Sequence, residues 1–212
     1  MQITKIRSDK RAPGNLVVEV DGARFASVPA EVVLEMRLSR GLTLDDGLRE
    51  RLSHAADVSA AYQVALRMLA AQPRAVNEML QRLRQRGHRM PAVSEAVGRL
   101  EVRGLLDDVK FARNFARVRL SRGHGPPRIL SDLLARGVDR KIASRAIDEG
   151  VEAEGIDPVR EARTLAEKRS AQLGDLPRQT KRRRLLAYLR RRGYSGYEVG
   201  DMVREVIGGS RE

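Results

Sequence analysis

The sequence predicts a mainly α-helical protein, an elongated array of three tandem three-helix repeats behind a small N-terminal β-hairpin-plus-helix head. Three observations support this fold class. A pattern of two leucines followed by Arg-Gly occurs three times along the chain. Apolar residues recur with helical spacing from about residue 57 onwards. One Asp-Gly pair lies between two alternating segments near the N-terminus, which is typical of a hairpin.

The repeat is clearest around three glycines, Gly87, Gly137 and Gly193, each of which directly follows an arginine. Leucines stand seven and four residues before each glycine, on one face of a helix that the glycine is expected to close with a positive φ. Apolar residues six and ten positions after each glycine predict a further helix. The glycines are 50 and 56 residues apart, a length typical of one supersecondary unit that stacks on its neighbours.

The head is predicted to occupy residues 1–56. Two alternating segments flank Asp21 and Gly22, and a two-residue turn at this point would place Val18 opposite Phe25. One face of the hairpin would then be apolar. Because an isolated hairpin is only marginally stable, a further strand and a packed helix are expected to support it.

The segments that flank the hairpin supply this support. Residues 3–7 are expected to add a third strand. A short helix should run from Pro29 towards Gly41, and a second helix should begin at Thr43. Asp46, three residues after this threonine, resembles the second member of a capping box.

The remaining chain is read as helices. Pro158 suits the first turn of a helix that Asp157 would cap. The predicted segments are helical repeat 1 (57–106), helical repeat 2 (107–150), an acidic linker (151–157), helical repeat 3 (158–207) and a frayed tail (208–212).

Composition excludes several classes of protein. The chain of 212 residues contains no cysteine, so disulfides, thiolate metal sites and thiol nucleophiles are absent. No apolar run approaches the ~18 residues of a membrane span, and the N-terminus has no signal-peptide core. We therefore expect a cytoplasmic protein without membrane contact.

The net charge of +13 is unevenly distributed. Residues 1–50 are neutral, whereas the repeats carry the whole excess of positive charge. A basic surface attracts polyanions, either nucleic acid or an acidic protein. The 35 arginines against six lysines can also reflect genome composition, so composition alone does not establish binding.

The most basic segment, residues 178–192, contains eight basic residues in fifteen and no acidic residue. Its leucines should face inward, leaving arginines exposed. A solvated helix face is the simple alternative, but concentrated like charge favours an anionic partner. The candidate contacts in this segment are Lys181, Arg182, Arg183, Arg184, Arg190, Arg191 and Arg192. The lesser candidates in the central repeat are Arg113, Arg117, Arg128 and Arg136.

Motifs for catalysis are missing from the sequence. There is no phosphate-binding P-loop, no G-x-S-x-G and no dinucleotide-binding glycine pattern. His54, His88 and His124 are scattered along the chain. Asp107 and Asp108 are better explained as helix-capping residues than as a metal or catalytic pair. We expect no enzyme activity, no cofactor and no metal site.

Two adjacent blocks carry a resemblance to a known family. Residues 104–112, GLLDDVKFA, match the Gly-Leu-(Leu/Ile)-(Asp/Asn)-Asp-x-x-(Phe/Tyr)-Ala signature of the RecX family of bacterial regulatory proteins. Residues 123–137 match its next block, a Gly-rich turn followed by Pro, Ile, Leu and a helix-closing Gly. The resemblance extends over about residues 57–207, and the head resembles that of longer family members.

This resemblance implies a regulator of the RecA recombinase. RecX proteins bind the RecA filament on single-stranded DNA, in its groove or at its end, and restrain ATP hydrolysis, strand exchange in homologous recombination and SOS activation in DNA repair. The implied partners are RecA and its nucleoprotein filament. We also expect weak non-specific DNA binding and a monomer. The resemblance does not distinguish capping, groove blocking and disassembly.

Two other functions are compatible with the pattern of residues. An autonomous basic DNA-binding protein could use the three-helix repeats as helix-turn-helix-like units. A helical scaffold could carry its basic faces only for solubility. The first alternative predicts a preference for particular duplex sequences, and the second predicts no appreciable binding to DNA or RecA.

Overall fold

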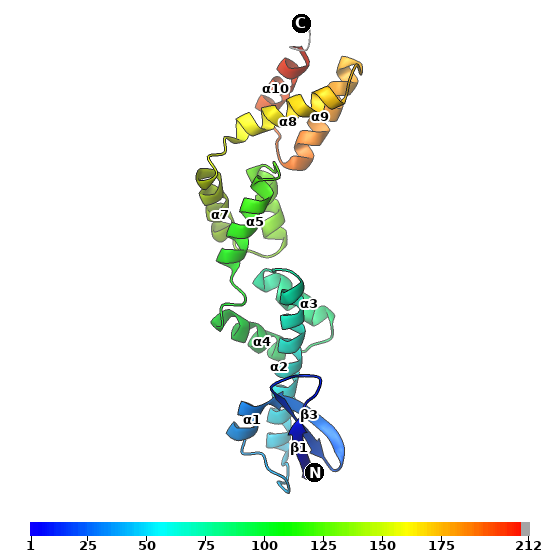
Figure 1. The fold of residues 1–212 in the computed structure, drawn as a ribbon, viewed down its shortest axis with the longest axis vertical. Coiled ribbons are helices and arrows are strands. Elements are labelled where there is room, and N and C mark those ends of the chain that lie inside the picture. The colour runs from blue at the N-terminus through cyan, green and yellow to red at the C-terminus, as the bar shows by residue number, and fades with distance from the viewer. Residues whose placement is uncertain (209–212) are drawn as a thin grey trace. The chain divides into compact units, whose positions relative to one another are not determined.

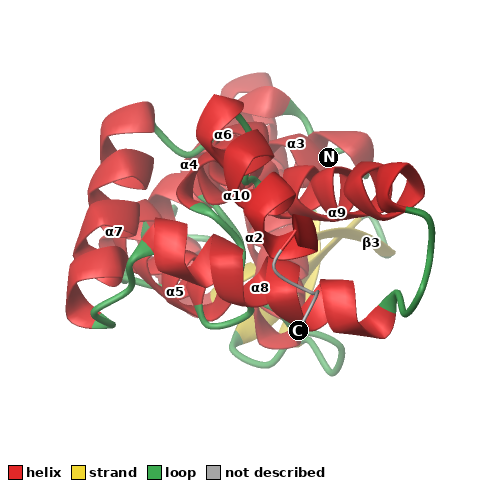
Figure 2. Cartoon of the chain, turned by 90° about the horizontal axis from the view of Figure 1, so that it is seen from above, coloured by secondary structure: helices red, strands yellow, loops and turns green. Residues whose placement is uncertain are grey.

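The computed structural model describes residues 1–208, and these divide into two compact units, residues 1–107 and the described residues from 108 onwards (Figure 1). Three strands open the chain, and the remaining regular elements of the described residues are helices (Figure 2). The prediction of three three-helix repeats behind a β-containing head is confirmed. The helices are α1 (Ala30–Glu35), α2 (Asp46–Ala71), α3 (Val76–Gln85), α4 (Met90–Val102), α5 (Asp108–Leu120), α6 (Pro126–Ala135), α7 (Arg140–Ala153), α8 (Pro158–Gln172), α9 (Arg178–Arg192) and α10 (Tyr197–Gly208).

The head is an antiparallel sheet with the strand order β1-β2-β3. Strands β1 (Ile3–Ser8), β2 (Asn15–Val20) and β3 (Ala23–Pro29) include the third strand that the sequence predicted. Asp21 and Gly22 both have positive φ, at 48° and 82°, as expected for a tight two-residue hairpin turn.

The predicted hairpin register is wrong beyond the first two pairs. Glu19 pairs with Arg24, as a two-residue hairpin turn requires. Val18 then pairs with Ala26 rather than with Phe25. A bulge leaves Phe25 as the extra residue on β3. The shift buries both Val18 and Ala26 in the core of the head, with Phe25 packed at its margin.

Helix α1 is shorter than the predicted segment, which extended towards Gly41. The helix ends because Arg37 has a φ of 50°, in the left-handed region. The following amide, that of Leu38, donates to the carbonyl of Val33 at 2.9 Å and closes the last turn. This helix end could not be predicted because no glycine marks it in the sequence.

Helix α2 begins later than predicted and passes through the expected boundary after residue 56 without a break. Asp45, not Thr43, caps it by accepting a hydrogen bond from the amide of Leu48 at 2.7 Å. Its N-terminal half places Leu52 in the core of the head, and its C-terminal half packs on α4. One helix therefore joins the head to the first repeat.

The three repeats share a buried framework that the sequence revealed in part. Besides the leucine four residues before each glycine, the residue eight positions before it is completely buried. The leucines seven positions before, which the prediction emphasised, are only half-buried. The completely buried residues are Met79, Leu83, Ile129, Leu133, Leu185 and Leu189.

The three repeat glycines close their helices as predicted. Gly87, Gly137 and Gly193 have φ values of 86°, 80° and 94°. The amide after each glycine donates to the carbonyl of the buried leucine, at 3.2 Å in the first two repeats and 3.0 Å in the third. This pattern is the expected glycine closure of a helix.

The acidic linker predicted at 151–157 begins inside α7, which continues to Ala153. Asp157 then caps α8, because its carboxylate accepts hydrogen bonds from the amides of Val159 at 2.9 Å and Arg160 at 3.3 Å. The tail predicted at 208–212 lies outside the described residues, apart from Gly208 at the end of α10.

Candidate partner-binding surface

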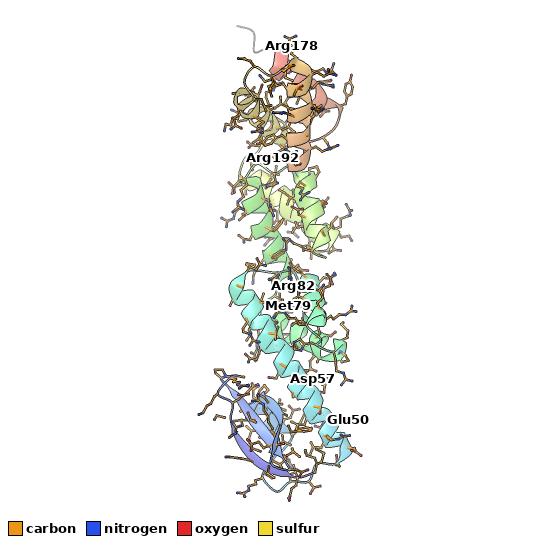
Figure 3. All side chains as sticks on the ribbon, turned by 90° about the vertical axis from the view of Figure 1, so that its right-hand side faces the viewer. Glu50, Asp57, Met79, Arg82, Arg178 and Arg192 are labelled. Carbon is orange, nitrogen blue, oxygen red and sulfur yellow. The ribbon has the colours of Figure 1, made fainter. Side chains whose placement is uncertain are left out.

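Helix α9 presents the most basic surface of the third repeat, and Figure 3 marks Arg178 and Arg192 at its two ends. Leu185 and Leu189 are fully buried and fix the inward face of the helix against α8 and α10. The other arginines of α9 project into solvent, except Arg192, which is half-buried. Among the predicted contacts on α9, the exposed residues that form no ion pair with any other described residue are Arg182, Arg183, Arg184, Arg190 and Arg191. We call these five residues the α9 arginine surface.

Lys181 has a different environment from these arginines. It is half-buried and lines an open pocket of about 530 Å³ together with Arg163, Glu167, Asp175 and Glu205, among other residues. Its positive charge therefore lies in a mixed-charge setting. Lys181 is therefore less exposed than the predicted arginine contacts on the same helix.

Arg192 is a structural residue of the C-terminal unit. Its guanidinium packs over the Tyr188 ring at 4.9 Å from the centroid. One Nη1 atom donates to the carbonyl oxygens of Arg122 at 2.6 Å and Gly123 at 3.3 Å. Sequence reasoning assigned this residue to a partner, whereas its hydrogen bonds join the third repeat to the turn before α6.

The backbone on either side of this contact is packed closely. The amide of Gly125 donates to the carbonyl of Arg192 at 2.7 Å. A Cβ atom on Gly193 would lie only 2.4 Å from the Cβ of Arg128, and one on Gly125 would lie 2.9 Å from the Tyr194 ring. Burial, with a smaller effect of nearby Glu161, raises the pKa of the Tyr194 hydroxyl to about 12, so it stays neutral. We call this contact the repeat 2–3 junction.

His124 lies at the same junction. Burial of its ring, followed by the positive charges of Arg119 and Arg192, lowers the pKa of His124 below its ordinary value of 6.5. Arg128 acts in the same direction, whereas Asp132 opposes it. The Nδ1 atom is buried and has no hydrogen-bond partner among the described residues. The imidazole is therefore held neutral at pH 7.

This environment predicts a pH effect on stability. The pKa of His124 is lower in the folded protein than in the unfolded chain. The stabilisation that its neutral ring contributes is therefore fully present above about pH 6.5 and is lost as the pH falls through the folded pKa. We expect the NMR titration of His124 to show a midpoint below 6.5. We also expect the thermal unfolding temperature to fall less between pH 7.5 and 5.5 in His124→Gln than in the wild type. Identical pH profiles for both proteins would contradict this account.

The candidate arginines of the central repeat lie on or at the end of α5 and α6, and each has a partner within the chain. Arg113 pairs with Glu149 at 2.8 Å, and Arg117 donates to the side chain of Asn114 at 3.2 Å. Hydrogen bonds from Arg113 and then Arg145 lower the pKa of the Glu149 carboxyl. These arginines are less available to an external anion than those of the α9 arginine surface.

The other two central candidates are also engaged. Arg128 pairs with Asp132 at 3.1 Å, and the guanidinium of Arg136 lies 5.3 Å from the centroid of the Phe115 ring. Arg119 lies 5.0 Å from the same ring, which also stacks on Phe111 at 5.9 Å. Arg119 was not among the predicted contacts, although its i,i+4 spacing from Phe115 was a usable signal.

Metal sites and membrane spans each need a recognisable arrangement of residues. Within residues 1–208, no three His, Cys, Asp or Glu side chains come together in an arrangement that could hold a metal ion. None of the helices described has the length and apolar character needed to span a bilayer.

Two domain models of one family match the first and second repeats. The family models described as the first and second three-helix domains of RecX match residues 61–100 and 107–147. The regulatory protein RecX of Halorhodospira halophila is 36% identical over 140 residues, covering 66% of this chain and 84% of the relative. The RecX of Geobacillus thermodenitrificans is 28% identical and covers 91% of this chain and 71% of the relative.

Solved structures extend the likeness to the whole fold. The crystal structure of a regulatory protein RecX superposes with a TM-score of 0.73 over 96% of this chain and 98% of the other, at 22% identity. The RecX structure from Lactobacillus salivarius gives a TM-score of 0.57 at 25% identity, over 71% of this chain and 96% of the other.

The fold and the α9 arginine surface define a protein of tandem three-helix repeats with an exposed basic helix in the last repeat. Combined with the matched domains and relatives, these features identify the family. The chain belongs to the RecX family of regulatory proteins.

Proposed function

We propose that this protein restrains RecA by binding the RecA filament on single-stranded DNA, thereby lowering ATP hydrolysis, strand exchange and SOS activation. The observation that carries the proposal is the α9 arginine surface in a member of the RecX family. Five exposed guanidinium groups without an internal ion pair are suited to a strongly anionic partner. A nucleoprotein filament supplies such a partner. The proposal assumes a cytoplasmic monomer.

The mode of binding follows from the organisation into repeats. Each repeat is a separate helical module, and several weak contacts on one chain would act together with a high effective concentration. The basic third repeat would contribute the electrostatic attraction, which accelerates association. Contacts from the other repeats would then supply selectivity for RecA over other anionic surfaces.

The alternative of an autonomous duplex-reading protein is less well supported. A helix-turn-helix unit places its last helix in the major groove, where exposed carboxylates are repelled by phosphates. In the third repeat this helix is α10, which carries Glu198, Asp201 and Glu205. In the first repeat, α4 carries Glu95, which pairs with His54 and Arg99. Helix α7 of the second repeat opens with Arg140 but also carries Asp148, Glu149 and Glu152.

The proposal is tested by titrating the full-length protein into ATP hydrolysis by the cognate RecA, with single-stranded DNA in excess. Inhibition well below one molecule per RecA protomer is expected if the filament is the target. Inhibition that begins only when the protein saturates the DNA would instead indicate competition for the strand. The proposal would then be abandoned for a simple nucleic-acid binder.

A further inference from the structure

An open pocket of about 530 Å³ lies in the third repeat, beside the turn that joins α8 to α9. Its lining residues come from α8, from this turn at residues 173–177, from α9 and from α10. These three helices pack on one another (Figure 1). The volume falls within the range of about 300–1,000 Å³ that is typical of small-molecule sites. The proposed action on RecA gives this pocket no role.

One buried hydroxyl group on the wall of the pocket lacks a partner. Ser170 lies in the last turn of α8, lines the pocket and has only 4% of its surface exposed. Its Oγ atom has no hydrogen-bond partner among the described residues. Buried polar side chains usually form hydrogen bonds, because burial without a partner is costly. A polar ligand in the pocket would supply the missing bond.

The pocket carries charges of both signs, and three of its charged side chains are unpaired. Arg163 and Glu205 form an ion pair at 2.5 Å. The half-buried Lys181 and the exposed Glu167 and Asp175 form no ion pair with another described residue. One cation and two carboxylates are therefore available to a ligand. A ligand that matches them carries one carboxylate and two positive groups.

The ends of two helices give the pocket the same polarity. Helix α8 ends at Gln172, and the C-terminal end of a helix favours positive charge. Helix α9 begins at Arg178 without a side-chain cap, and the free amides of its first turn favour negative charge. Lys181 lies near the start of α9, whereas Glu167 lies near the end of α8. Both effects favour a carboxylate beside α9 and a positive group beside α8.

We propose that this pocket binds a basic α-amino acid, with its carboxylate at Lys181 and its two positive groups at Glu167 and Asp175. The hydroxyl of Ser170 forms a hydrogen bond with the ligand. Arginine suits the site better than lysine, because a guanidinium group donates two parallel hydrogen bonds to a carboxylate. The site goes beyond the proposed action on RecA, since its ligand is a small molecule and its residues lie outside the α9 arginine surface.

Other classes of ligand match this pocket less well. Its three carboxylates repel a polyanion such as a nucleic-acid backbone. A metal ion lacks a ligand set, because no three acidic or histidine side chains within residues 1–208 come together to hold one. A diamine would match the two carboxylates but would leave Lys181 without a partner. A basic α-amino acid satisfies all three unpaired groups.

The test compares L-arginine with two analogues that each lack one of its charges. L-Citrulline keeps the shape of arginine but has a neutral side chain, and agmatine keeps both positive groups but has no carboxylate. Binding to the full-length protein is followed by ¹H–¹⁵N NMR at constant ionic strength. We expect L-arginine to bind about tenfold more tightly than either analogue, with shifts of the Gly174 and Asp175 amide signals.

Three results of this comparison would overturn the proposal. Equal affinities for the three compounds would show that the pocket does not recognise their charges. Shifts that do not include the turn between α8 and α9 would place binding elsewhere. Tighter binding of agmatine than of L-arginine would show that the site recognises positive groups alone.

Lys181→Gln isolates the contact with the ligand carboxylate. This variant should bind L-arginine about tenfold more weakly without losing affinity for agmatine, which has no carboxylate. Lys168→Gln is the matched control, because Lys168 is an exposed lysine of α8 that does not line the pocket. It should bind L-arginine within about twofold of the wild type. Equal losses in both variants would contradict the proposed carboxylate contact, since net charge alone would then control binding.

Ser170→Ala separates ligand binding from folding. Alanine removes a hydroxyl that has no partner and favours a helix more than serine does, so the midpoint of urea unfolding should not fall. The affinity for L-arginine should fall about fivefold. An unchanged affinity would overturn the role of Ser170, whatever the midpoint. Because RecA is absent from all these measurements, their outcome is independent of the ATPase titration.

Discussion

Replacement of Gly193 by alanine is expected to lower the free energy of unfolding by about 3 kcal/mol. This glycine has a φ of 94°, where an alanine is strained. A Cβ atom would also lie 2.4 Å from the Cβ and 2.8 Å from the backbone nitrogen of Arg128. The helices α6 and α9 would have to separate, which would break the hydrogen bonds of the repeat 2–3 junction.

Gly87→Ala is the matched control for this prediction. Gly87 closes the equivalent helix of the first repeat with a φ of 86°, but a Cβ atom there would have no neighbour within 4 Å. Only backbone strain remains, so we expect a loss of about 1 kcal/mol. Urea unfolding followed by circular dichroism measures both values. Equal losses for the two variants would show that close packing at the junction contributes nothing.

Charge reversal of four of the five residues of the α9 arginine surface is expected to have the largest functional effect. The variant R183E/R184E/R190E/R191E should inhibit RecA ATP hydrolysis at least tenfold less potently than the wild type, because attraction to the anionic filament becomes repulsion. The four side chains are exposed and unpaired in the described structure, so the helical circular dichroism should remain intact.

The control for this experiment changes the same amount of charge elsewhere. R51E/R67E/R84E/R86E reverses four exposed arginines of the N-terminal unit that form no ion pair with the described residues. We expect at most a threefold loss of potency in this protein. Similar losses in both quadruple variants would show that net charge, rather than the α9 arginine surface, controls inhibition. Unchanged inhibition in the first variant would remove this surface from the binding site.

Much of the helical fold could be predicted from spacing alone. Gly87, Gly137 and Gly193 mark helix ends in the sequence because positive φ strongly favours glycine. The end of α1 was missed because Arg37 adopts the same conformation without that signal. The bulge at Phe25 was missed because register depends on contacts with the rest of the core, which local alternation does not encode.

The candidate site shows the same distinction between local and long-range information. The inward leucines of α9 follow from helical period, so the exposure of Arg183 and Arg190 could be predicted. The structural role of Arg192 could not, because its hydrogen-bond acceptors, Arg122 and Gly123, lie about 70 residues earlier in the chain. Long-range contacts similarly occupy Arg113 with Glu149.

Direct binding to the filament is the most decisive measurement for the proposed function. The labelled full-length protein would be titrated with RecA filaments assembled on single-stranded DNA with a non-hydrolysable ATP analogue, and separately with the same DNA alone. We expect at least tenfold higher affinity for the filament at equal salt. Equal or higher affinity for the bare strand would contradict regulation through the filament.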